Sequence, residues 1–260
     1  MRKGNRVYLS TCAVFSILFF FLAVPALVLA DSVGERRSFF VDPSYDESKR
    51  NELEATLRVA NSKAYFYIEE TWWNSQKPED QAQIQSFFVN LATEFEQKIY
   101  PTLTNTFGSE WNPGIDNQGP ITILLHAMRD DAGGYTNYGD EYPRVQVPRS
   151  NEREMVYLSV KATRGPFLKS FLSHEFLHLI TFNQKEKIRK VSEEVWLNEV
   201  RAEYAPTLMG YDATYEDSNL QRRVNNFLDK PSNALTECDQ KTYDYGIANL
   251  FSQYLVDQYG

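Results

Sequence analysis

The fold depends most on residues 167–182, which read FLKSFLSHEFLHLITF. Within this stretch, the intervals of three or four residues connect Phe167, Phe171, His174, His178 and Phe182. Side chains with this spacing lie one above the other on the same face of an α-helix. The spacing therefore predicts a helix after Pro166 whose inner stripe carries two histidines as well as aromatic side chains.

The two histidines belong to the run His174-Glu175-Phe176-Leu177-His178, an HExxH pattern. One helical turn separates them, so their imidazoles can reach a single zinc ion at about 2 Å. Glu175 stands beside them, where its carboxylate can take a proton from a water on that metal and pass it to a leaving amine. The alternative is a pair of core histidines bonded to neighbouring carbonyl groups. Because two of the three histidines in the chain fall in the motif, we favour the metal site.

A catalytic zinc needs a third protein ligand and an open position for water. The candidate is Glu199 in the run Trp196-Leu197-Asn198-Glu199, on a second predicted helix. His126 is the rival ligand, although it reads as the last residue of a strand. Glu203 follows Glu199 by one turn on the same face, so we expect it to accept a hydrogen bond from a ligating histidine and fix its tautomer. Without the HExxH pattern, both glutamates would read as part of a solvated helix face.

Together, HEFLH at 174–178 and WLNE at 196–199 resemble the gluzincin clan of zinc peptidases. The similarity is closest to the hyicolysin-like secreted bacterial peptidases and extends over about residues 60–260. The resemblance implies that Asn198 and Glu199 correspond to the Asn-Glu pair of the thermolysin members. In those members the glutamate binds zinc, and an aspartate four residues later supports the first histidine. Glu203 stands at that position here, and Val200 stands where the aminopeptidase branch has glycine.

The same resemblance implies a fold and a further catalytic group. The expected fold is α+β and zincin-like, with a mixed α/β upper lobe and the active-site helix over a helical lower lobe that is minimal or truncated at Gly260. In the aminopeptidase branch, a tyrosine before a Gly-x-Ala helix start stabilises the oxyanion formed during attack. Tyr243 falls on that position in Tyr243-Asp244-Tyr245-Gly246-Ile247-Ala248, and Tyr245 is its rival. The alternative is that both are packing aromatics at a helix start.

The remaining periodicity predicts a mixed first half and a helical second half. The predicted strands are 64–68, 121–125 and 155–160, and the predicted helices are 78–101, 193–208, 219–228 and 245–260. Residues 31–61 are charged and mixed and support no assignment. Residues 129–150 read as a long loop whose acidic side chains lack the spacing of an EF-hand calcium site. We expect an N-terminal α/β lobe over 31–165 and a zinc-binding helical lobe over 166–260.

The first thirty residues are expected to be a secretory signal peptide and not part of the fold. Arg2, Lys3 and Arg6 precede an apolar run from Val7 to Ala30 that ends in small or apolar residues. The run is long enough to span a bilayer, so an uncleaved anchor is the alternative. Cleavage predicts a secreted or extracytoplasmic bacterial protein, which would associate with a membrane only if this segment stays attached.

Removal of that leader changes the net charge from −8 to −11, because the leader contains three basic and no acidic residues. An acidic chain of this kind is a poor partner for nucleic acid or for an anionic membrane. Cys238 would be the one remaining cysteine, which excludes an intrachain disulfide.

The whole pattern predicts a secreted zinc peptidase that acts on a protein or peptide substrate. Two alternatives stay open. The first is a secreted or surface binding protein that keeps the scaffold without turnover, and the second is a zinc hydrolase that cleaves a non-peptide bond.

Overall fold

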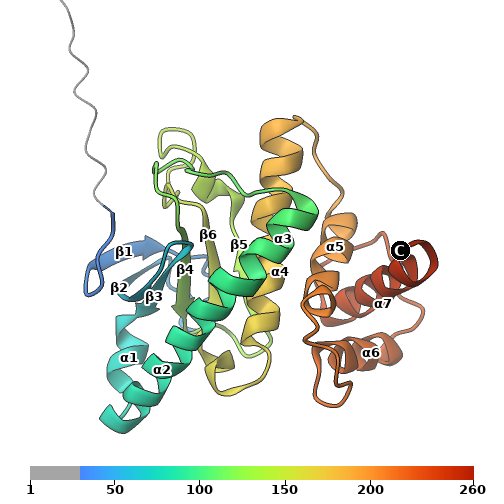
Figure 1. Ribbon diagram of the computed structural model, residues 1–260, viewed down its shortest axis with the longest axis horizontal. Helices are drawn as coiled ribbons and strands as arrows, with labels where there is room; N and C mark the ends of the chain where they lie inside the picture. Colours follow the sequence, from blue (N-terminus) through green and yellow to red (C-terminus); the bar gives the residue numbers. More distant parts are fainter. Residues whose placement is uncertain (1–29) are drawn as a thin grey trace, which may run out of the picture.

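The computed structural model describes residues 30–260, which form one mixed sheet with helices on one face and a helical region beyond them (Figure 1). The strands are β1 (Arg36–Phe40), β2 (Glu52–Ala60), β3 (Ala64–Glu69), β4 (Ile121–His126), β5 (Gly134–Thr136) and β6 (Met155–Ser159). Their order across the sheet is β1-β2-β3-β4-β6-β5. The β3–β4 and β4–β6 pairs are parallel, and the other pairs are antiparallel.

Helices alternate with strands in the first part of the chain, and only helices follow β6. They are α1 (Glu70–Ser75), α2 (Pro78–Glu94), α3 (Tyr100–Phe107), α4 (Leu168–Phe182), α5 (Val195–Leu208), α6 (Asn219–Asp229) and α7 (Thr242–Tyr259). Two segments are π-helical, Phe95–Ile99 and Asn183–Ile188, and two are 3₁₀-helical, Tyr138–Glu141 and Val160–Arg164. The predicted α+β class is therefore confirmed.

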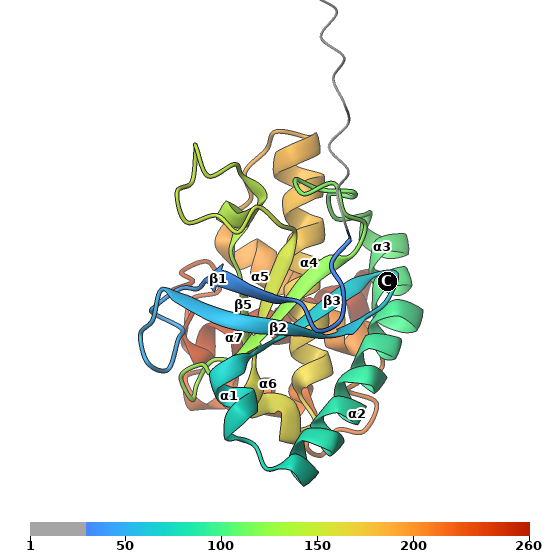
Figure 2. The same cartoon turned by 90° about the vertical axis from the view of Figure 1, so that its left-hand side faces the viewer.

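The central strands are apolar on both sides, and this gives the sheet two buried faces. Ile123 and Leu125 of β4 join the hydrophobic cluster under the helices, whereas Leu124 joins the opposite cluster with Tyr67. The alternation follows the two-residue period of a strand. Figure 2 views the sheet from its β1–β2 side, with α2 and α3 beside it.

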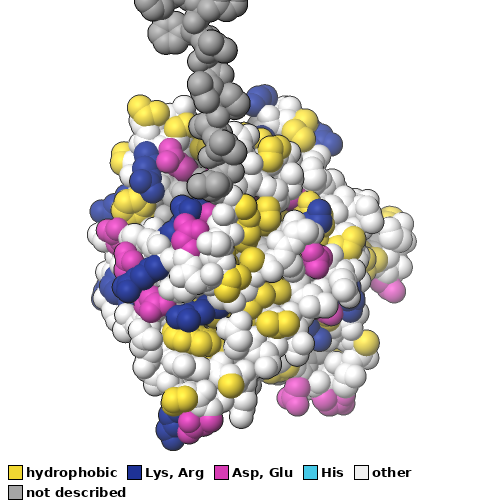
Figure 3. All heavy atoms as spheres, turned by 60° about the vertical axis from the view of Figure 1, so that its left-hand side comes forward, with side chains coloured by type: hydrophobic (Ala, Val, Ile, Leu, Met, Phe, Trp, Pro, Cys, Tyr) yellow, Lys and Arg dark blue, Asp and Glu magenta, His cyan; other side chains and the backbone are white. Residues whose placement is uncertain are grey.

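The edge strand β1 combines one buried side with one charged side. Phe39 is buried, while Arg36 Nε lies 3.0 Å from Glu54 Oε2 on β2. Basic and acidic side chains lie close together on this part of the surface (Figure 3). Charged side chains on an edge strand discourage pairing with other chains. These charged side chains also interrupt the apolar pattern that would indicate a strand. The sequence therefore supported no assignment for residues 31–61, although β1 and β2 lie there.

Helix α4 connects the sheet with the helical region. It packs on β6 and on α5, and α7 packs on both α5 and α6, so α4 stands between the sheet and the last three helices (Figure 1). Ile68 and Ala205 belong to the same hydrophobic cluster, although they lie on either side of the lobe boundary expected near residue 165. The two predicted lobes thus share a core, and the division into lobes stays a prediction.

Two sequence predictions need correction. The helix expected to end at Pro101 continues to Phe107, because the π-helical turn Phe95–Ile99 leads into α3. Pro101 then lies in the first turn of α3, where its missing N–H costs little. The loop expected over 129–150 contains the short strand β5, which pairs with β6.

Asp31 is the first buried residue of the described chain. Its Oδ2 lies 2.7 Å from Arg153 Nη1 and accepts a hydrogen bond from the Tyr67 hydroxyl at 2.7 Å. Its Oδ1 lies 2.8 Å from Arg37 Nη2. Burial alone would raise the pKa of Asp31, but these partners hold it below its ordinary value. The described chain therefore begins beside a buried carboxylate that is fixed by three partners.

The signal peptide predicted over residues 1–30 lies outside the described residues, except for residue 30 itself. Among residues 30–260, none of the helices is both long enough and apolar enough to cross a bilayer.

Candidate metal centre

Helix α4 holds the two motif histidines in a fixed orientation. Phe176 stacks on Tyr100 at a centroid distance of 5.5 Å and meets Phe95 edge-on at 5.0 Å. These contacts come from the α2–α3 side of the helix, and they prevent α4 from rotating about its axis. As a result, His174 and His178 project toward the neighbouring helix α5.

The structure brings Glu199 of α5 to the two histidines. The Nε2 atoms of His174 and His178 are 3.1 Å apart, and Glu199 Oε2 lies 3.3 Å from the first and 3.5 Å from the second. Three ligand atoms bound at 2.0–2.1 Å around a tetrahedral ion would be about 3.3–3.4 Å apart. The observed triangle therefore has the size of one face of such a tetrahedron, and this buried group could hold a metal ion.

The bonding of the three side chains supports the same conclusion. Glu199 Oε2 and His178 Nδ1 are buried without a hydrogen-bond partner. Within the described residues, no backbone carbonyl accepts a hydrogen bond from either motif histidine, so the alternative of two satisfied core histidines lacks its expected partners. Buried polar atoms are rarely left without partners, and a cation held by the two Nε2 atoms would satisfy Glu199 Oε2.

The charges of the cluster are strongly coupled. Burial disfavours the charged form of each side chain, yet the two imidazoles hold the pKa of Glu199 well below its ordinary value. In the same way, Glu199 raises the pKa of His178 to about 9 against the effect of burial. Without a metal, a proton on His178 thus offsets the charge of the carboxylate. A bound cation would replace that proton.

Glu203 lies beside His174, and the hydrogen bond expected between them stays a prediction. Its Oε1 lies 3.4 Å from His174 Nδ1. Arg223 of α6 holds the same carboxylate through both oxygens, with Nε donating to Oε2 at 2.8 Å. Asn249 of α7 donates to the Glu203 carbonyl oxygen at 3.0 Å. The roles of Arg223 and Asn249 could not be read from the sequence, because no motif links α6 and α7 to the histidines.

Asn198 lies beside the cluster but bonds mainly to the opposite wall. Its Nδ2 donates to the Tyr138 hydroxyl at 2.9 Å, and Tyr138 stacks face to face on Phe182 at 4.5 Å. Asn198 also contributes to the raised pKa of His178. Asn198 thereby ties the ligand helix α5 to the segment that follows β5.

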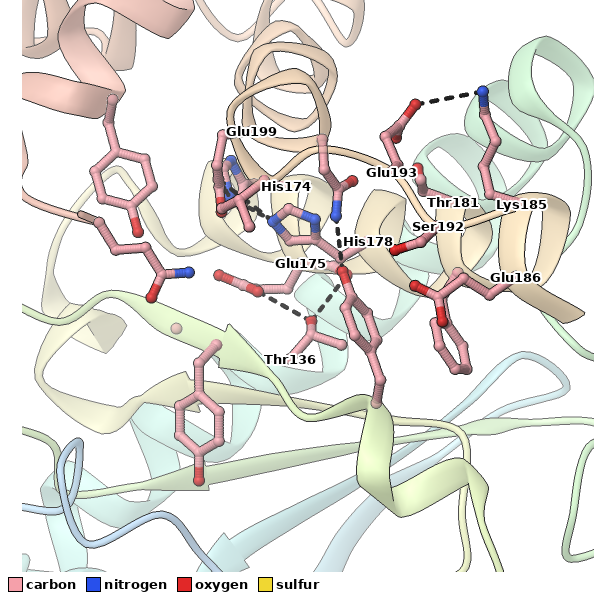
Figure 4. A pocket seen from close by; sticks show the side chains of 18 of the residues that line it. Thr136, His174, Glu175, His178, Thr181, Lys185, Glu186, Ser192, Glu193 and Glu199 are labelled. Carbon is pink, nitrogen blue, oxygen red and sulfur yellow. Dashed lines mark hydrogen bonds and ion pairs between the residues drawn. The ribbon is translucent and has the colours of Figure 1, made fainter. Parts of the chain in front are cut away.

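Glu175 faces the edge strand β5 (Figure 4). Its Oε2 accepts a hydrogen bond from the Thr136 hydroxyl at 3.0 Å, and burial raises the pKa of its carboxyl group. A Cβ atom on Gly134 would lie 2.8 Å from the Tyr157 carbonyl oxygen and 3.0 Å from Glu175 Cγ. Glycine at this position therefore lets the edge strand approach Glu175 closely.

The two candidate tyrosines of α7 have different surroundings. The Tyr245 ring lies 6.3 Å from the His174 ring and lines the cavity, whereas Tyr243 does not line it and packs under Lys230 Nζ at 4.1 Å. Residues two apart on a helix point to opposite sides, so only one of the pair can face the histidines. Gly246 is explained by packing, since a Cβ there would lie 2.6 Å from the Phe227 nitrogen of α6.

His126 takes no part in the cluster. It is fully buried at the end of β4, and its Nδ1 lies 3.4 Å from Asp46 Oδ2. The sequence interpretation of this histidine as a strand-end residue is therefore confirmed.

Two hollows open on either side of Glu175 and His174. The first has a volume of about 310 Å³ and extends toward α4, α5 and Lys185, and the second has a volume of about 530 Å³ and extends toward α6. Both are lined by Tyr45, Gly134, His174, Glu175, Gln240 and Tyr245. The two hollows therefore adjoin at His174 and Glu175 and form one cleft, and the first hollow is also lined by His178 and Glu199.

Comparison with protein-family models finds no family that matches the chain, and a search of curated proteins finds no match.

Proposed function

We propose that the chain is a zinc-dependent peptidase with a zincin-like fold of the gluzincin type, most similar to the hyicolysin-like enzymes. The observation that carries this proposal is the triangle formed by His174 Nε2, His178 Nε2 and Glu199 Oε2, whose sides of 3.1–3.5 Å fit one ion. Two imidazole nitrogens and one carboxylate oxygen are a donor set typical of catalytic zinc.

Zinc held there would supply Lewis acidity toward a water and toward the carbonyl group of the scissile bond. Glu175 provides the base. Its Oε2 is engaged by Thr136, which leaves Oε1 to take the proton of the attacking water and to deliver it to the leaving amine. The hydrogen bond from Thr136 also fixes the plane of the carboxylate.

Tyr245 is the better donor for the oxyanion, in place of Tyr243. Its side chain lines the cleft on the α7 side, near His174, where its hydroxyl can donate to a substrate carbonyl oxygen. Burial, together with the negative charge of Glu199, raises the pKa of Tyr245 well above its ordinary value, so the hydroxyl keeps its proton.

The outer residues keep the ligands in place. Glu203 Oε1, 3.4 Å from His174 Nδ1, would hold a proton on that nitrogen and so leave the Nε2 lone pair free for a metal, while Arg223 holds Glu203 at both oxygens. The Asn198–Tyr138 hydrogen bond restrains the approach of α5 to the opposite wall. The hydrogen bond from Thr136 to Glu175 favours an enzyme over a binding protein, because a scaffold without turnover has no need of an oriented base.

The substrate is proposed to be a peptide, since two adjoining hollows meet at His174 and Glu175 and both are lined by Gly134 of the edge strand β5. A zinc hydrolase of a non-peptide bond is the second candidate. We also propose secretion, on the basis of the leader sequence at residues 1–30.

A digest of a broad peptide library, with and without a chelator, tests the proposal. We expect cleavage that the chelator abolishes and zinc restores, about one zinc per chain by elemental analysis, and retention of that zinc in Glu175→Gln without proteolysis. Full activity in Glu175→Gln would eliminate the proposed base. A zinc-loaded chain that leaves the whole library intact would support a binding protein.

A further inference from the structure

The two hollows of the cleft carry different charges. The second hollow is lined by the basic side chains of Arg129, Arg222, Arg223 and Lys241. Three of these have carboxylate partners: Arg223 binds Glu203, Arg129 Nε lies 3.0 Å from Asp131, and Lys241 Nζ lies 3.0 Å from Asp239. Within residues 30–260, Arg222 has no ion pair.

The guanidinium of Arg222 is held in position without being neutralised. One Nη donates to Asn219 Oδ1 at 2.6 Å, and the group lies 5.1 Å from the Phe171 ring centroid and 5.5 Å from that of Phe167. Its Nε is buried without a hydrogen-bond partner. Burial and the adjacent Arg223 lower the pKa of Arg222 to about 10, so it remains positively charged at neutral pH. A fixed, unpaired cation in a cleft is suited to bind an incoming anion.

The first hollow has the opposite character. Glu186 and Glu193 line it, together with Lys185. Glu193 is paired with Arg201 and with Lys185, whose Nζ lies 3.3 Å from it. Glu186 has no ion pair within the described chain. A substrate carboxylate would therefore be repelled at this end of the cleft and attracted at the end that contains Arg222.

The carboxylates of Asp42 and Glu175 also line the second hollow. Asp42 Oδ1 accepts a hydrogen bond from the Ser44 backbone at 2.8 Å and Glu175 Oε2 accepts one from the Thr136 hydroxyl at 3.0 Å, and within the described residues neither carboxylate forms an ion pair with Arg222. Asp131 and Asp239 are paired with Arg129 and Lys241 as described above. Arg222 is thus the cation of this hollow that remains available to a ligand.

We infer that the hollow beside Arg222 binds a carboxylate of the peptide substrate, close to the bond that is cleaved. This inference rests on the proposed peptidase function and specifies its substrate class. The carboxylate has two sources, an acidic side chain within the peptide or the α-carboxylate at its C-terminus. Both would form a charge-assisted pair with the guanidinium of Arg222.

The test compares quenched fluorescent peptides that differ at one position at a time on either side of the bond found in the library digest. Each position carries Glu or Gln, and each peptide is made with a free or an amidated C-terminus. We expect kcat/KM to be about 10- to 100-fold higher for a carboxylate-bearing peptide than for its neutral counterpart. Preference for Glu inside the peptide identifies a side-chain site, and preference for the free terminus identifies a C-terminal site.

Arg222→Gln should reduce this ratio to about 1, and the matched variant Arg129→Gln should keep it, because Arg129 is already paired with Asp131. Equal rates for charged and neutral peptides in the unaltered chain would overturn the inference while the peptidase function stands. A preference that persists in Arg222→Gln would also overturn it.

A binding measurement separates this inference from the proposed function. Labelled Glu and Gln peptides are titrated into zinc-loaded Glu175→Gln and into the same variant with Arg222→Gln added, with fluorescence anisotropy as the readout. Tighter binding of the acidic peptide that disappears with Arg222→Gln supports the carboxylate site, even if the library digest shows no cleavage. Equal binding of both peptides counts against the site whatever the digest shows.

Discussion

Glu199 and Glu141 are buried to a similar degree, with 5% and 2% of their surfaces exposed, yet the pKa values of their carboxyl groups move in opposite directions. Burial raises both, but the two imidazoles hold the pKa of Glu199 well below its ordinary value. Burial and the charge of Glu154 raise that of Glu141 to about 8. Lys187 Nζ, 3.8 Å from Glu141 Oε2, offsets this only in part.

The comparison shows what distinguishes a binding site from a buried acid. Glu199 converges with two histidine nitrogens on one point in space, whereas both oxygens of Glu141 are buried without hydrogen-bond partners. Within residues 30–260, the three-residue cluster at Glu199 is the one group of this kind that could hold a metal. Burying an isolated charge costs free energy. Where several ligand atoms converge on one point, a bound cation compensates the buried carboxylate and offsets that cost.

The largest expected effect is the loss of the metal ligand. Glu199→Gln should weaken zinc binding by roughly a thousandfold or more, beyond the 10- to 100-fold typical of an outer-shell change, and should abolish proteolysis. Competition with a chromophoric chelator measures the affinity. The same substitution at Glu141 is the control and should leave zinc affinity near its original value. A comparable loss in Glu141→Gln would break the distinction between the two carboxylates.

Zinc itself should stabilise the fold. At a free zinc concentration 100 times the Kd, binding to the native state adds about 2.7 kcal/mol, which corresponds to about 5–11 °C in Tm for a chain of this size. Differential scanning fluorimetry with and without zinc measures the shift. It should be lost in Glu199→Gln and retained in Glu141→Gln. An equal shift in both variants would place the stabilising zinc elsewhere.

The support of His174 by Glu203 should matter less than the ligand itself. We expect Glu203→Gln to lower zinc affinity by about 10- to 100-fold, because the amide is a weaker acceptor at His174 Nδ1. Arg223→Met removes the clamp on Glu203 but leaves its charge, so its effect should be smaller. The two affinities come from the same chelator competition. A larger loss in Arg223→Met would mean that position, not charge, is what Glu203 contributes.

The smallest effect should come from Glu141 and depend on pH. A carboxyl group whose pKa is raised from 4.5 in the unfolded chain to about 8 in the fold contributes stability below pH 4.5, and that contribution is lost as the pH rises through 8. Glu141→Gln should therefore lose less stability than the unaltered chain between pH 6 and pH 9, by about 2–6 °C in Tm. Lys187→Met should steepen the loss, since the cation lowers the pKa of Glu141. A pH profile that is the same in all three proteins would contradict the raised pKa.

Helical and strand periodicity predicted the central part of the molecule well. Helices α4, α5 and α6 and strands β3, β4 and β6 follow patterns of buried residues that are visible in the chain. The charged strands β1 and β2 were not recognised, and the π-helical turn before Pro101 was not foreseen. Both depend on tertiary packing, which favours conformations that local sequence does not indicate.

The candidate site was also predicted only in part, because the sequence indicates residues related by local spacing and not residues that tertiary packing brings together. His174, Glu175 and His178 lie on one helix, and Glu199 and Glu203 on the next, so spacing alone indicated their faces. The opposite wall with Gly134 and Thr136, the clamp from Arg223 and the unpaired Arg222 arise where distant segments meet. The choice between Tyr243 and Tyr245 depended on the rotation of α7, and packing on α6 sets that rotation.

The clamp on Asp31 determines where the chain can be shortened. A version that begins at Asp31 keeps the carboxylate between Arg153, Arg37 and the Tyr67 hydroxyl, and its new amino group adds a positive charge next to two arginines. A version that begins one residue later leaves Arg153 buried and without this counter-charge. A boundary between residues 30 and 31 therefore keeps the clamp on Asp31, and a boundary between residues 31 and 32 removes it.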